Sequence, residues 1–337
     1  MPAARGEKRK REGGAAGGAP KEARIESGPP WTGAEVRRRL LNKEYVYGTC
    51  VTSTSPKQVD AVVKTGVGLV FIDTEHVPIV RDTLSWMCQL YDARGVTPLV
   101  RVPEPEPYRV AEYLDAGARG IVAPYIETVA QARMLVGATK LRPLKGELLD
   151  YILERLTPVD PKVYVADGEV RTNELLYAQV EKILRERGDP HPEKTTAFMK
   201  KKCGNNFLML NIESVAAVGR LEDLAAFPGV DGFQVGPHDL SCNYGVPEEW
   251  ESAEFHGAID RIIEVAEKYH IACGIHYAFA KYREYQIKWG KAGARLVLHS
   301  NDIKLFVATL KADLAHMAES NGDPAPPAAS SGEADAI

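Results

Sequence analysis

Side chains that can bind cations, carboxylates and protons follow directly after several short apolar runs of this sequence. In the stretch FIDTEHVP, Asp73, Glu75 and His76 follow the apolar residues at 68–72, and Pro78 prevents an extended segment from continuing. Charged groups are costly to bury without partners, so a purely structural strand gains nothing from them. The stretch therefore indicates a functional site where these runs end.

Two carboxylates, Glu213 and Asp239, follow two successive apolar runs and are about one strand–helix unit apart. Adjacent parallel strands are about 4.8 Å apart, so both carboxylates can reach one hard cation. Mg²⁺ is commonly held by one or two carboxylates, with water and substrate oxygens in the remaining positions. The pair is predicted to bind a divalent cation, Mg²⁺ by preference, with Mn²⁺ or Co²⁺ as alternatives.

Two further side chains at such ends suit an organic acid and a proton. Arg101 carries a permanently charged planar fork that matches a carboxylate. His76 has an ordinary pKa close to neutrality and is the natural proton carrier. With a cation, this set could bind a 2-oxo acid and stabilise its enolate. A lone acid, arginine or histidine is more often structural, so the prediction depends on their meeting at one rim.

The pattern of the chain predicts how these residues meet. Short runs rich in Val, Ile, Leu and Phe alternate with amphipathic segments that have apolar residues three and four apart. Such alternation favours parallel strands with helical crossovers, and eight repeats predict an α/β fold, a closed (β/α)8 TIM barrel. The carboxyl ends of the strands then face one catalytic mouth. The predicted strands are 45–51, 68–73, 97–101, 120–124, 207–212, 230–235, 271–276 and 295–299.

Three segments do not fit the repeat. Residues 1–30 and 321–337 contain few large apolar side chains and are predicted to be disordered tails on either side of a barrel at 31–320. About 144–206 form an insertion between the fourth helix and the fifth strand, with one helical stretch near 173–187. Long insertions in compact domains are usually functional or disordered, so this one is predicted to form part of a lid or a subunit contact.

Composition predicts a soluble protein. With 45% hydrophobic residues and a net charge of −4, the chain has neither a membrane-spanning run nor a basic field for nucleic acid on its folded part. Five widely spaced cysteines without a C-x-x-C pair disfavour disulfides and structural zinc. A reducing, cytoplasmic location is expected. The basic run at 8–11 is predicted to be a solvated tail, with a nuclear address as the alternative.

Five motifs in order carry a family resemblance. DTEHVP, PLVRVP, YLDAGARGIVAPYIET, LNIES and GVDGFQVGPHDLS resemble those of the HpcH/HpaI family of metal-dependent class II pyruvate aldolases, whose fungal relatives include macrophomate synthase. The resemblance covers about 45–318, apart from the insertion. It implies metal ligands at Glu213 and Asp239, a carboxylate- and enolate-binding arginine at Arg101 and a catalytic histidine at His76.

The resemblance also implies the surroundings of these groups. Asp115 would orient His76, and Asp73 would lie near the water shell of the metal. Trimers or hexamers would form by exchange of the last helix, at 302–318. Gly236 matches a glycine that closes round the oxo acid, and the full set of predicted substrate-binding residues is Arg101, Tyr125, Asn211, Gly236, Pro237 and His238.

Departures from the family pattern concern the second substrate. Only PLKG remains, at 143–146, of a loop rich in glycine and arginine, and His238 stands where relatives have a small residue. His276 and His299 are added at neighbouring strand ends. The acceptor is therefore predicted to be altered, with a bulky or aromatic molecule as one option, although ordinary rim histidines are equally compatible.

The sequence predicts a lyase that acts through a pyruvate enolate. The reaction would be aldol cleavage of 4-hydroxy-2-oxo acids or decarboxylation of oxaloacetate, with an unknown acceptor in a homo-oligomer. A CoA-ester lyase of the wider citrate-lyase superfamily is one alternative, although no basic pocket for the CoA phosphates is evident outside the insertion. A non-catalytic barrel that serves as a scaffold is another.

Overall fold

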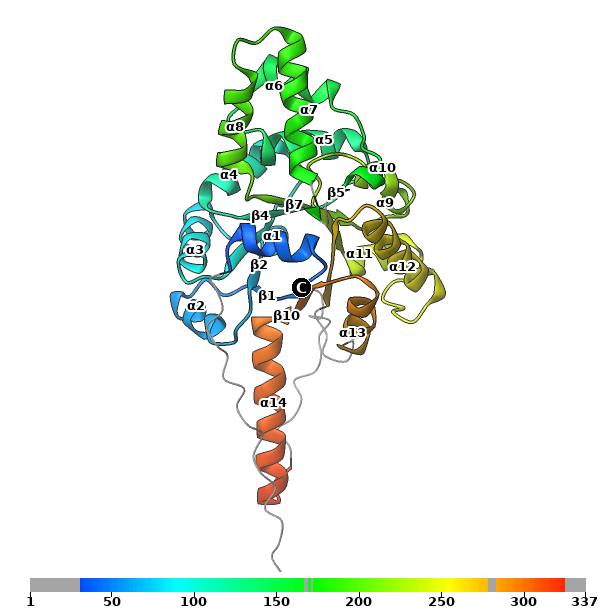
Figure 1. Ribbon diagram of the computed structural model, residues 1–337. Coiled ribbons are helices and arrows are strands. Elements are labelled where there is room, and N and C mark those ends of the chain that lie inside the picture. Colours follow the sequence, from blue (N-terminus) through cyan, green and yellow to red (C-terminus); the bar gives the residue numbers. More distant parts are fainter. Residues whose placement is uncertain (1–30, 167–168, 171, 278–282, 325–337) are drawn as a thin grey trace, which may run out of the picture.

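The computed structural model describes residues 31–166, 169–170, 172–277 and 283–324. Eight parallel strands close into a barrel in the order β1-β10-β9-β8-β7-β4-β3-β2 (Figure 1). All eight predicted strands and the barrel fold are confirmed. The predicted tails lie mostly outside the described residues, as does the basic run at 8–11. The barrel strands are β1 (Val46–Val51), β2 (Leu69–Asp73), β3 (Thr97–Arg101), β4 (Gly120–Ala123), β7 (Phe207–Ile212), β8 (Gly232–Val235), β9 (Ala272–Tyr277) and β10 (Leu296–Asn301).

Helices in the crossovers cover the outside of the barrel and bury one apolar face each. Among the residues that the structure describes, no helix is both long enough and apolar enough to cross a membrane. These helices are α2 (Pro56–Val63), α3 (Arg81–Ala93), α4 (Pro107–Ala116), α5 (Val129–Lys140), α9 (Val215–Val218), α10 (Leu221–Ala225), α11 (Pro237–Asn243), α12 (Ala253–Lys268) and α13 (Arg283–Ala292).

The inside of the barrel is filled by side chains from alternate strand positions. Leu69 and Phe71 of β2 and Leu296 and Leu298 of β10 belong to one buried inner cluster. The alternate residues of β2, Val70 and Ile72, point outward and pack against the helices. This alternation decides which strand residues can reach the mouth of the barrel.

Helix α1 (Gly33–Leu41) closes the amino-terminal end of the barrel. Val36 and Leu40 insert into the inner cluster. The preceding residue Trp31 accepts a hydrogen bond from the Thr97 hydroxyl, 2.8 Å away at the start of β3. The barrel is therefore open for chemistry at the carboxyl ends of its strands.

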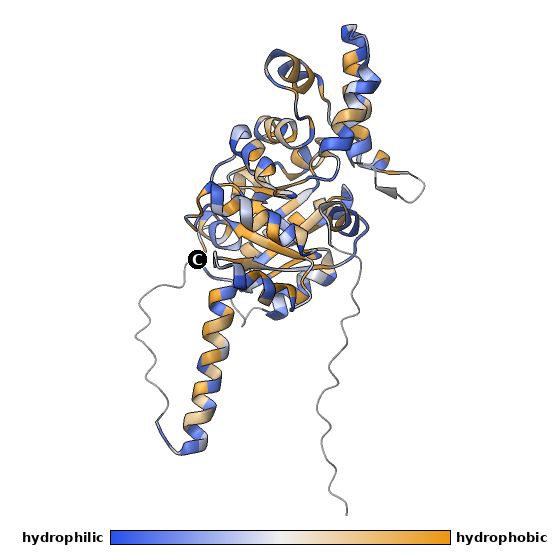
Figure 2. Ribbon diagram, turned by 90° about the vertical axis from the view of Figure 1, so that its left-hand side faces the viewer, coloured by the Kyte–Doolittle hydropathy of each residue, from blue (hydrophilic) through white to orange (hydrophobic). Residues whose placement is uncertain are grey.

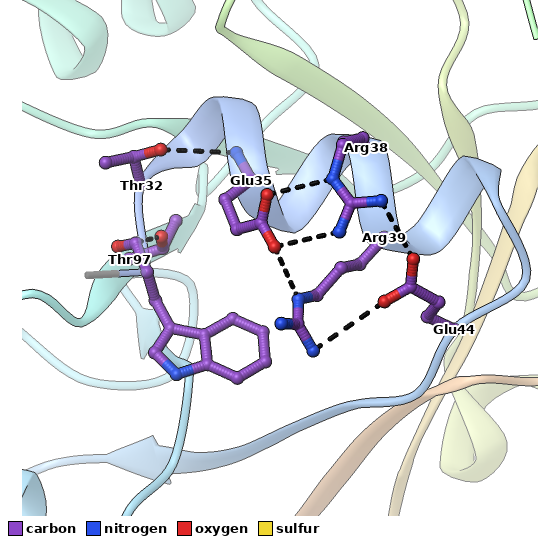
Figure 3. Close-up of polar contacts among 7 residues, drawn as sticks. Thr32, Glu35, Arg38, Arg39, Glu44 and Thr97 are labelled. Carbon is purple, nitrogen blue, oxygen red and sulfur yellow. Dashed lines mark hydrogen bonds and ion pairs between the residues drawn. The ribbon is translucent and has the colours of Figure 1, made fainter. Parts of the chain in front are cut away.

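A network of polar and charged side chains runs along α1 from Thr32 to Glu44 (Figure 3). The Thr32 hydroxyl caps the helix by accepting from the Glu35 N–H. The Glu35 carboxylate accepts from Arg38 and Arg39, which lowers its pKa to about 2, and both arginines also reach Glu44. Because these groups are partly exposed, each pair contributes at most about 1 kcal/mol.

A buried charge cluster joins α1 to the crossovers at the same end. Asp231, 2% exposed, accepts from Arg37 at 2.7 Å, from Lys140 at 2.6 Å and from the Leu208 N–H at 2.9 Å. Burial opposes the ionisation of Asp231, but the charges of Lys140 and Arg37 lower its pKa. Lys140 is fully buried, and burial lowers its pKa to about 8.

The insertion is a helical layer at one end of the molecule (Figure 1). Tyr177 in this layer donates to the Lys140 carbonyl, and Tyr164 donates to the Ala225 carbonyl, both at 3.1 Å, so the insertion shares the outer core. The predicted stretch at 173–187 is confirmed as a helix, whereas two further helices were not predicted. The elements are α6 (Gly146–Arg155), the 3-10 helix η1 (Pro161–Val163), the hairpin β5 (Val165–Ala166) and β6 (Glu169–Val170), α7 (Thr172–Arg187) and α8 (Pro192–Cys203).

The last helix, α14 (Asp302–Asn321), projects away from the barrel (Figure 1). None of its residues is buried, and apolar segments run along it (Figure 2). Apolar surfaces of this extent usually mark contact sites. The exposed apolar side chains are Ile303, Leu305, Phe306, Val307, Leu310, Leu314 and Met317.

Candidate active site

A cavity of about 350 Å³ opens at the carboxyl ends of the barrel strands. This is the end at which barrel enzymes build their sites. Eight predicted residues line it. They are Asp73, His76, Arg101, Asn211, Gly236, Pro237, His238 and Asp239.

Glu213 lies directly behind the wall of this cavity, just after β7. Its carboxylate accepts a hydrogen bond from the Asn211 amide and a second, at 3.1 Å, from the backbone N–H of Tyr125. Tyr125 has a φ of 56°, in the left-handed region. Gly236 leaves the space that the carboxylate needs, because a Cβ there would lie 2.6 Å from Glu213 Oε1.

Glu213 and Asp239 interact electrostatically. The pKa of Glu213 is raised to about 7, chiefly by burial, and the charge of Asp239 raises it while the Tyr125 N–H opposes the rise. Asp239 lines the cavity from the first turn of α11. The two carboxylates that the sequence pairs are therefore close enough to repel each other.

Arg101 is held by two acids beside these carboxylates. Its Nε and Nη2 donate to the two oxygens of Asp73 at 2.9 and 2.6 Å, and its Nη1 lies 3.1 Å from Glu75 Oε2. Burial opposes the ionisation of Asp73, but the hydrogen bonds and charge of Arg101 lower its pKa. Asp73 therefore orients the arginine, and N–H groups on Nη1 and Nη2 remain for a ligand.

Glu75 joins the groups on this side of the rim. His76 Nε2 lies 3.9 Å from Glu75 Oε2, and the imidazole is about half exposed, at 49%. A hydrogen bond to Glu75 is the main cause that raises the pKa of the Tyr125 phenol to about 12. The sequence left the role of Glu75 open. Its position just after a predicted strand already indicated that it lies at the mouth of the barrel.

Three residues named from the sequence, Asp115, Tyr125 and His299, do not line the cavity. Asp115 is the penultimate residue of α4, its side chain is 71% exposed, and it pairs with Arg142. Since α4 leads away from the mouth, Asp115 does not orient His76 within one chain, where the neighbouring acid is Glu75. His299 follows the inward-facing Leu298 on β10, so its side chain points outward. It forms a hydrogen bond with Gln286 on α13, outside the cavity.

The two other added histidines do line the cavity. His238 Nδ1 lies 3.3 Å from Glu248 Oε1 at the rim. Burial lowers the pKa of His276 to about 4, and its Nε2 lies 3.0 Å from the Ser300 carbonyl. His276 is therefore neutral near pH 7 and can act as a hydrogen-bonding group.

The insertion takes no part in the cavity. Helix α5 ends, and β7 begins, at the end of the barrel where the strands start. The segment between them is therefore attached at the end opposite the mouth. None of its described residues lines the cavity. The prediction of a lid is therefore not supported, and a subunit contact stays a prediction.

The donor set fits a hard divalent cation. The Glu213 and Asp239 carboxylates interact electrostatically, and the buried Oδ1 of Asn211 beside Glu213 has no hydrogen-bond partner among the residues that the structure describes. Among the described residues, no group of three or more acids, histidines and cysteines is arranged so that it could hold a metal ion. A cation would thus take two carboxylates, Glu213 and Asp239, and complete its shell with other oxygens, as Mg²⁺ prefers. Its charge would also relieve their repulsion.

The raised pKa of Glu213 predicts how stability depends on pH without metal. Between about pH 4.5 and pH 7 the folded chain holds a proton that the unfolded chain has released, so this group lowers stability as pH rises through that window. We expect Glu213→Gln to raise the melting temperature of the EDTA-treated protein at pH 8 and to leave it unchanged at pH 4.5. Equal shifts at both values, measured by scanning calorimetry, would contradict this.

The fold and the cavity define a class: a (β/α)8 barrel with an oxygen-rich, arginine-bearing site at its mouth. Residues 47–304 match the family model for HpcH/HpaI aldolase/citrate lyase. The chain belongs to this family.

Several relatives are similar over most of their length. The hydroxypyruvate/pyruvate aldolase of Delftia acidovorans is 26% identical over 277 residues, 82% of this chain and 89% of the relative. The 2-keto-3-deoxy-L-rhamnonate aldolase of Klebsiella pneumoniae is 25% identical over 287 residues, 84% and 95% of the two chains. A family structure from Burkholderia cenocepacia superposes with a TM-score of 0.63 at 26% identity, covering 84% of this chain and 99% of that one.

Proposed function

We propose that the chain is a divalent-metal-dependent carbon–carbon lyase that acts on 2-oxo acids through the enolate of pyruvate. The reaction would be aldol cleavage of 4-hydroxy-2-oxo acids or decarboxylation of oxaloacetate. The observation that carries the proposal is that Asp239 and Arg101 line one cavity, with the Glu213 carboxylate directly behind Gly236 of the same lining. The names of the pyruvate and keto-deoxy-sugar aldolases support this substrate class.

Each described group has a distinct part in this chemistry. Glu213 and Asp239, with Asn211 beside them, would hold the cation, Mg²⁺ by preference, which acts when bound as a Lewis acid toward the 2-oxo group. Arg101 would bind the substrate carboxylate with the N–H groups that Asp73 leaves available.

His76 would move the proton. It stands at the rim with its imidazole half exposed, so it can reach the hydroxyl of a 4-hydroxy-2-oxo acid while Arg101 holds the carboxylate deeper in the cavity. In cleavage it would take the hydroxyl proton as the bond between C3 and C4 breaks. In the synthetic direction it would return that proton to the new alkoxide.

Deuterium exchange into the methyl group of pyruvate tests the proposal without any acceptor. In D₂O with Mg²⁺, the protein should catalyse loss of the methyl proton signal in the NMR spectrum, and EDTA should abolish it. Formation of pyruvate from oxaloacetate, followed in parallel, would separate decarboxylation from aldol chemistry. Pyruvate that does not exchange with any of Mg²⁺, Mn²⁺ or Co²⁺ would refute enolate formation.

Replacing Gly236 with alanine should weaken cation binding. A Cβ at this position would lie 2.6 Å from Glu213 Oε1 and 2.7 Å from its Cγ, so the carboxylate must move. We expect Gly236→Ala to raise the Mg²⁺ dissociation constant at least about tenfold in calorimetric titrations, which corresponds to about 1.4 kcal/mol. Gly257→Ala, with no atom near the new Cβ, is the matched control. Identical titration curves for both variants would contradict this role of Gly236.

We also propose that the chain assembles as a homo-oligomer in which α14 packs on another copy, as a trimer or hexamer. The support is its apolar surface, which the described residues of the chain leave uncovered. Phe306 and Leu310, one turn apart, are 66% and 43% exposed. A surface of this kind is expected to be buried in solution.

Charges placed on this helix should dissociate the assembly. We expect Phe306→Glu combined with Leu310→Glu to reduce the mass measured by light scattering to that of one chain, because burying the carboxylates is costly. Two carboxylates at exposed positions near α2, Ala61→Glu with Lys64→Glu, should leave the mass unchanged. An unaltered mass for the α14 variant would exclude this interface.

A further inference from the structure

The floor of the cavity carries a polar side chain that the proposed enolate chemistry does not use. Cys50, Phe71 and Gln234 line the cavity, and Cys50 and Phe71 also belong to the buried inner cluster of the barrel. The two neighbours of Gln234 on β8 belong to the outer core, so Gln234 itself points inward. In the closed strand order β8 lies opposite β2, which carries Phe71. The cavity therefore extends from the strand ends into the inside of the barrel.

The amide of Gln234 is buried but only partly hydrogen-bonded. The residue is 2% exposed, and its Oε1 has no hydrogen-bond partner among the residues that the structure describes. Its Nε2 donates only to the carbonyl of the next residue, Val235, at a long distance of 3.4 Å. Buried polar groups are nearly always paired, so an unpaired acceptor in a cavity calls for a partner. Rotation about the last side-chain bond, which is soft in glutamine, can present the oxygen to a ligand.

A glycine on the neighbouring strand makes room for this amide. A Cβ at Gly274 would lie 2.4 Å from Gln234 Oε1 and 3.0 Å from the Cβ of Leu296. The φ of Gly274 is not in the positive region, so its backbone conformation is open to other residues. The absence of a side chain at position 274 therefore serves the space that the Gln234 amide occupies.

His276 adds a second acceptor to the lining. Its Nε2 lies 3.0 Å from the Ser300 carbonyl, which can only accept, so Nε2 carries the proton. Burial lowers the pKa of His276 to about 4, and the neutral ring therefore has a lone pair on Nδ1 near pH 7. The ring packs on Phe71, with centroids 5.5 Å apart, which places it near the floor. This part of the cavity thus presents acceptors and suits a ligand that carries an O–H donor.

We infer that Gln234 determines which donor substrate the site accepts and that it selects 2-oxo acids with a hydroxyl group on C3. The inference rests on the proposed function and narrows its substrate. With the carboxylate on Arg101 and the 2-oxo group beside Glu213 and Asp239, a C3 substituent that leaves the mouth open to the acceptor would point to the floor. There its hydroxyl would donate to Oε1 of Gln234, which a methyl group cannot do.

The reaction would then give a product with one more hydroxyl group. Loss of a C3 proton would form the enolate, and C3 would bond to the carbon of an aldehyde. The carbonyl electron pair of the aldehyde would move to its oxygen and take a proton. A 3,4-dihydroxy-2-oxo acid would result.

Two acids of nearly equal size test the inference on the wild-type protein. Hydroxypyruvate carries a hydroxyl group where 2-oxobutanoate carries a methyl group. Each would compete with pyruvate in the methyl exchange with Mg²⁺, which gives an inhibition constant for each acid. We expect the constant of hydroxypyruvate to be lower by about tenfold or more, because a site that hydrogen-bonds a hydroxyl rejects the analogue that lacks it. A smaller difference, or the reverse order, would overturn the inference.

Replacing Gln234 locates the preference. Gln234→Met keeps the length of the side chain and removes the amide, so the ratio of the two constants should fall to near unity. Gln58→Met, on α2 and outside the cavity, is the matched control and should keep the wild-type ratio. A wild-type preference that Gln234→Met leaves unchanged would refute the assignment to Gln234, and the wild-type competition decides even if this variant fails to fold. Absence of pyruvate exchange in the wild type would instead refute the proposed function.

Discussion

Glu213→Gln and Asp239→Asn are each expected to reduce Mg²⁺-dependent methyl exchange of pyruvate by about a thousandfold. Each change would remove one of the two charged ligands proposed for a cation whose Lewis acidity would be worth several kcal/mol, and about 1.4 kcal/mol corresponds to a factor of ten. The rise in melting temperature that saturating Mg²⁺ gives the wild type should also disappear, because that rise depends on binding to the folded state. Both substitutions preserve side-chain size, so the barrel itself should remain folded.

Glu249→Gln provides the control for these variants. This acid is exposed near the mouth, outside the set that lines the cavity, and its replacement should leave exchange and the Mg²⁺-induced shift at wild-type values. If either ligand variant kept exchange within tenfold of wild type, the assignment of the cation site would be wrong.

Asp231→Asn is expected to destabilise the fold by about 3 to 5 kcal/mol, the usual cost of removing one partner from a buried ion pair. Lys140, with no exposed surface, would lose its ion pair, and Arg37 would lose the one that joins α1 to the barrel. The effect is stability alone, because this cluster lies at the end of the barrel opposite the cavity. Urea denaturation followed by intrinsic fluorescence measures it.

Asp223→Asn is the matched control, because this aspartate is exposed on α10 and should shift the midpoint of unfolding very little. A second variant pairs Asp231→Asn with Lys140→Met and should recover part of the loss by removing the unpaired cation. Equal midpoints for Asp231→Asn and Asp223→Asn would show that the buried cluster does not stabilise the fold.

The sequence predicts the barrel well because its physical signals are local. An apolar run of strand length followed by an amphipathic segment specifies a strand and a covering helix, and all eight strands lie where such runs occur. The rule that carboxyl ends meet at one mouth also placed Arg101, Asn211 and Asp239 in the cavity.

The predictions that failed concern single side chains, because the direction in which a side chain points decides whether it reaches the cavity. His299 follows an inward-facing leucine on β10, so alternation along the strand sends it outward, and that parity could have been read in advance. Glu75 lies shortly after the end of β2, so the sequence placed it at the mouth but did not predict its contacts with Arg101 and His76. The position of Asp115 depends on the course of a whole helix, which no motif encodes.

The position of the insertion separates two parts of the molecule. Helices α6, α7 and α8 attach where α5 ends and β7 begins, behind the barrel floor and away from the reacting groups. An insertion at such a junction can be lengthened, exchanged or deleted during evolution, because it does not contact the residues at the mouth of the barrel. Changes in the length or sequence of this appendage can therefore be accommodated without moving the residues that line the cavity.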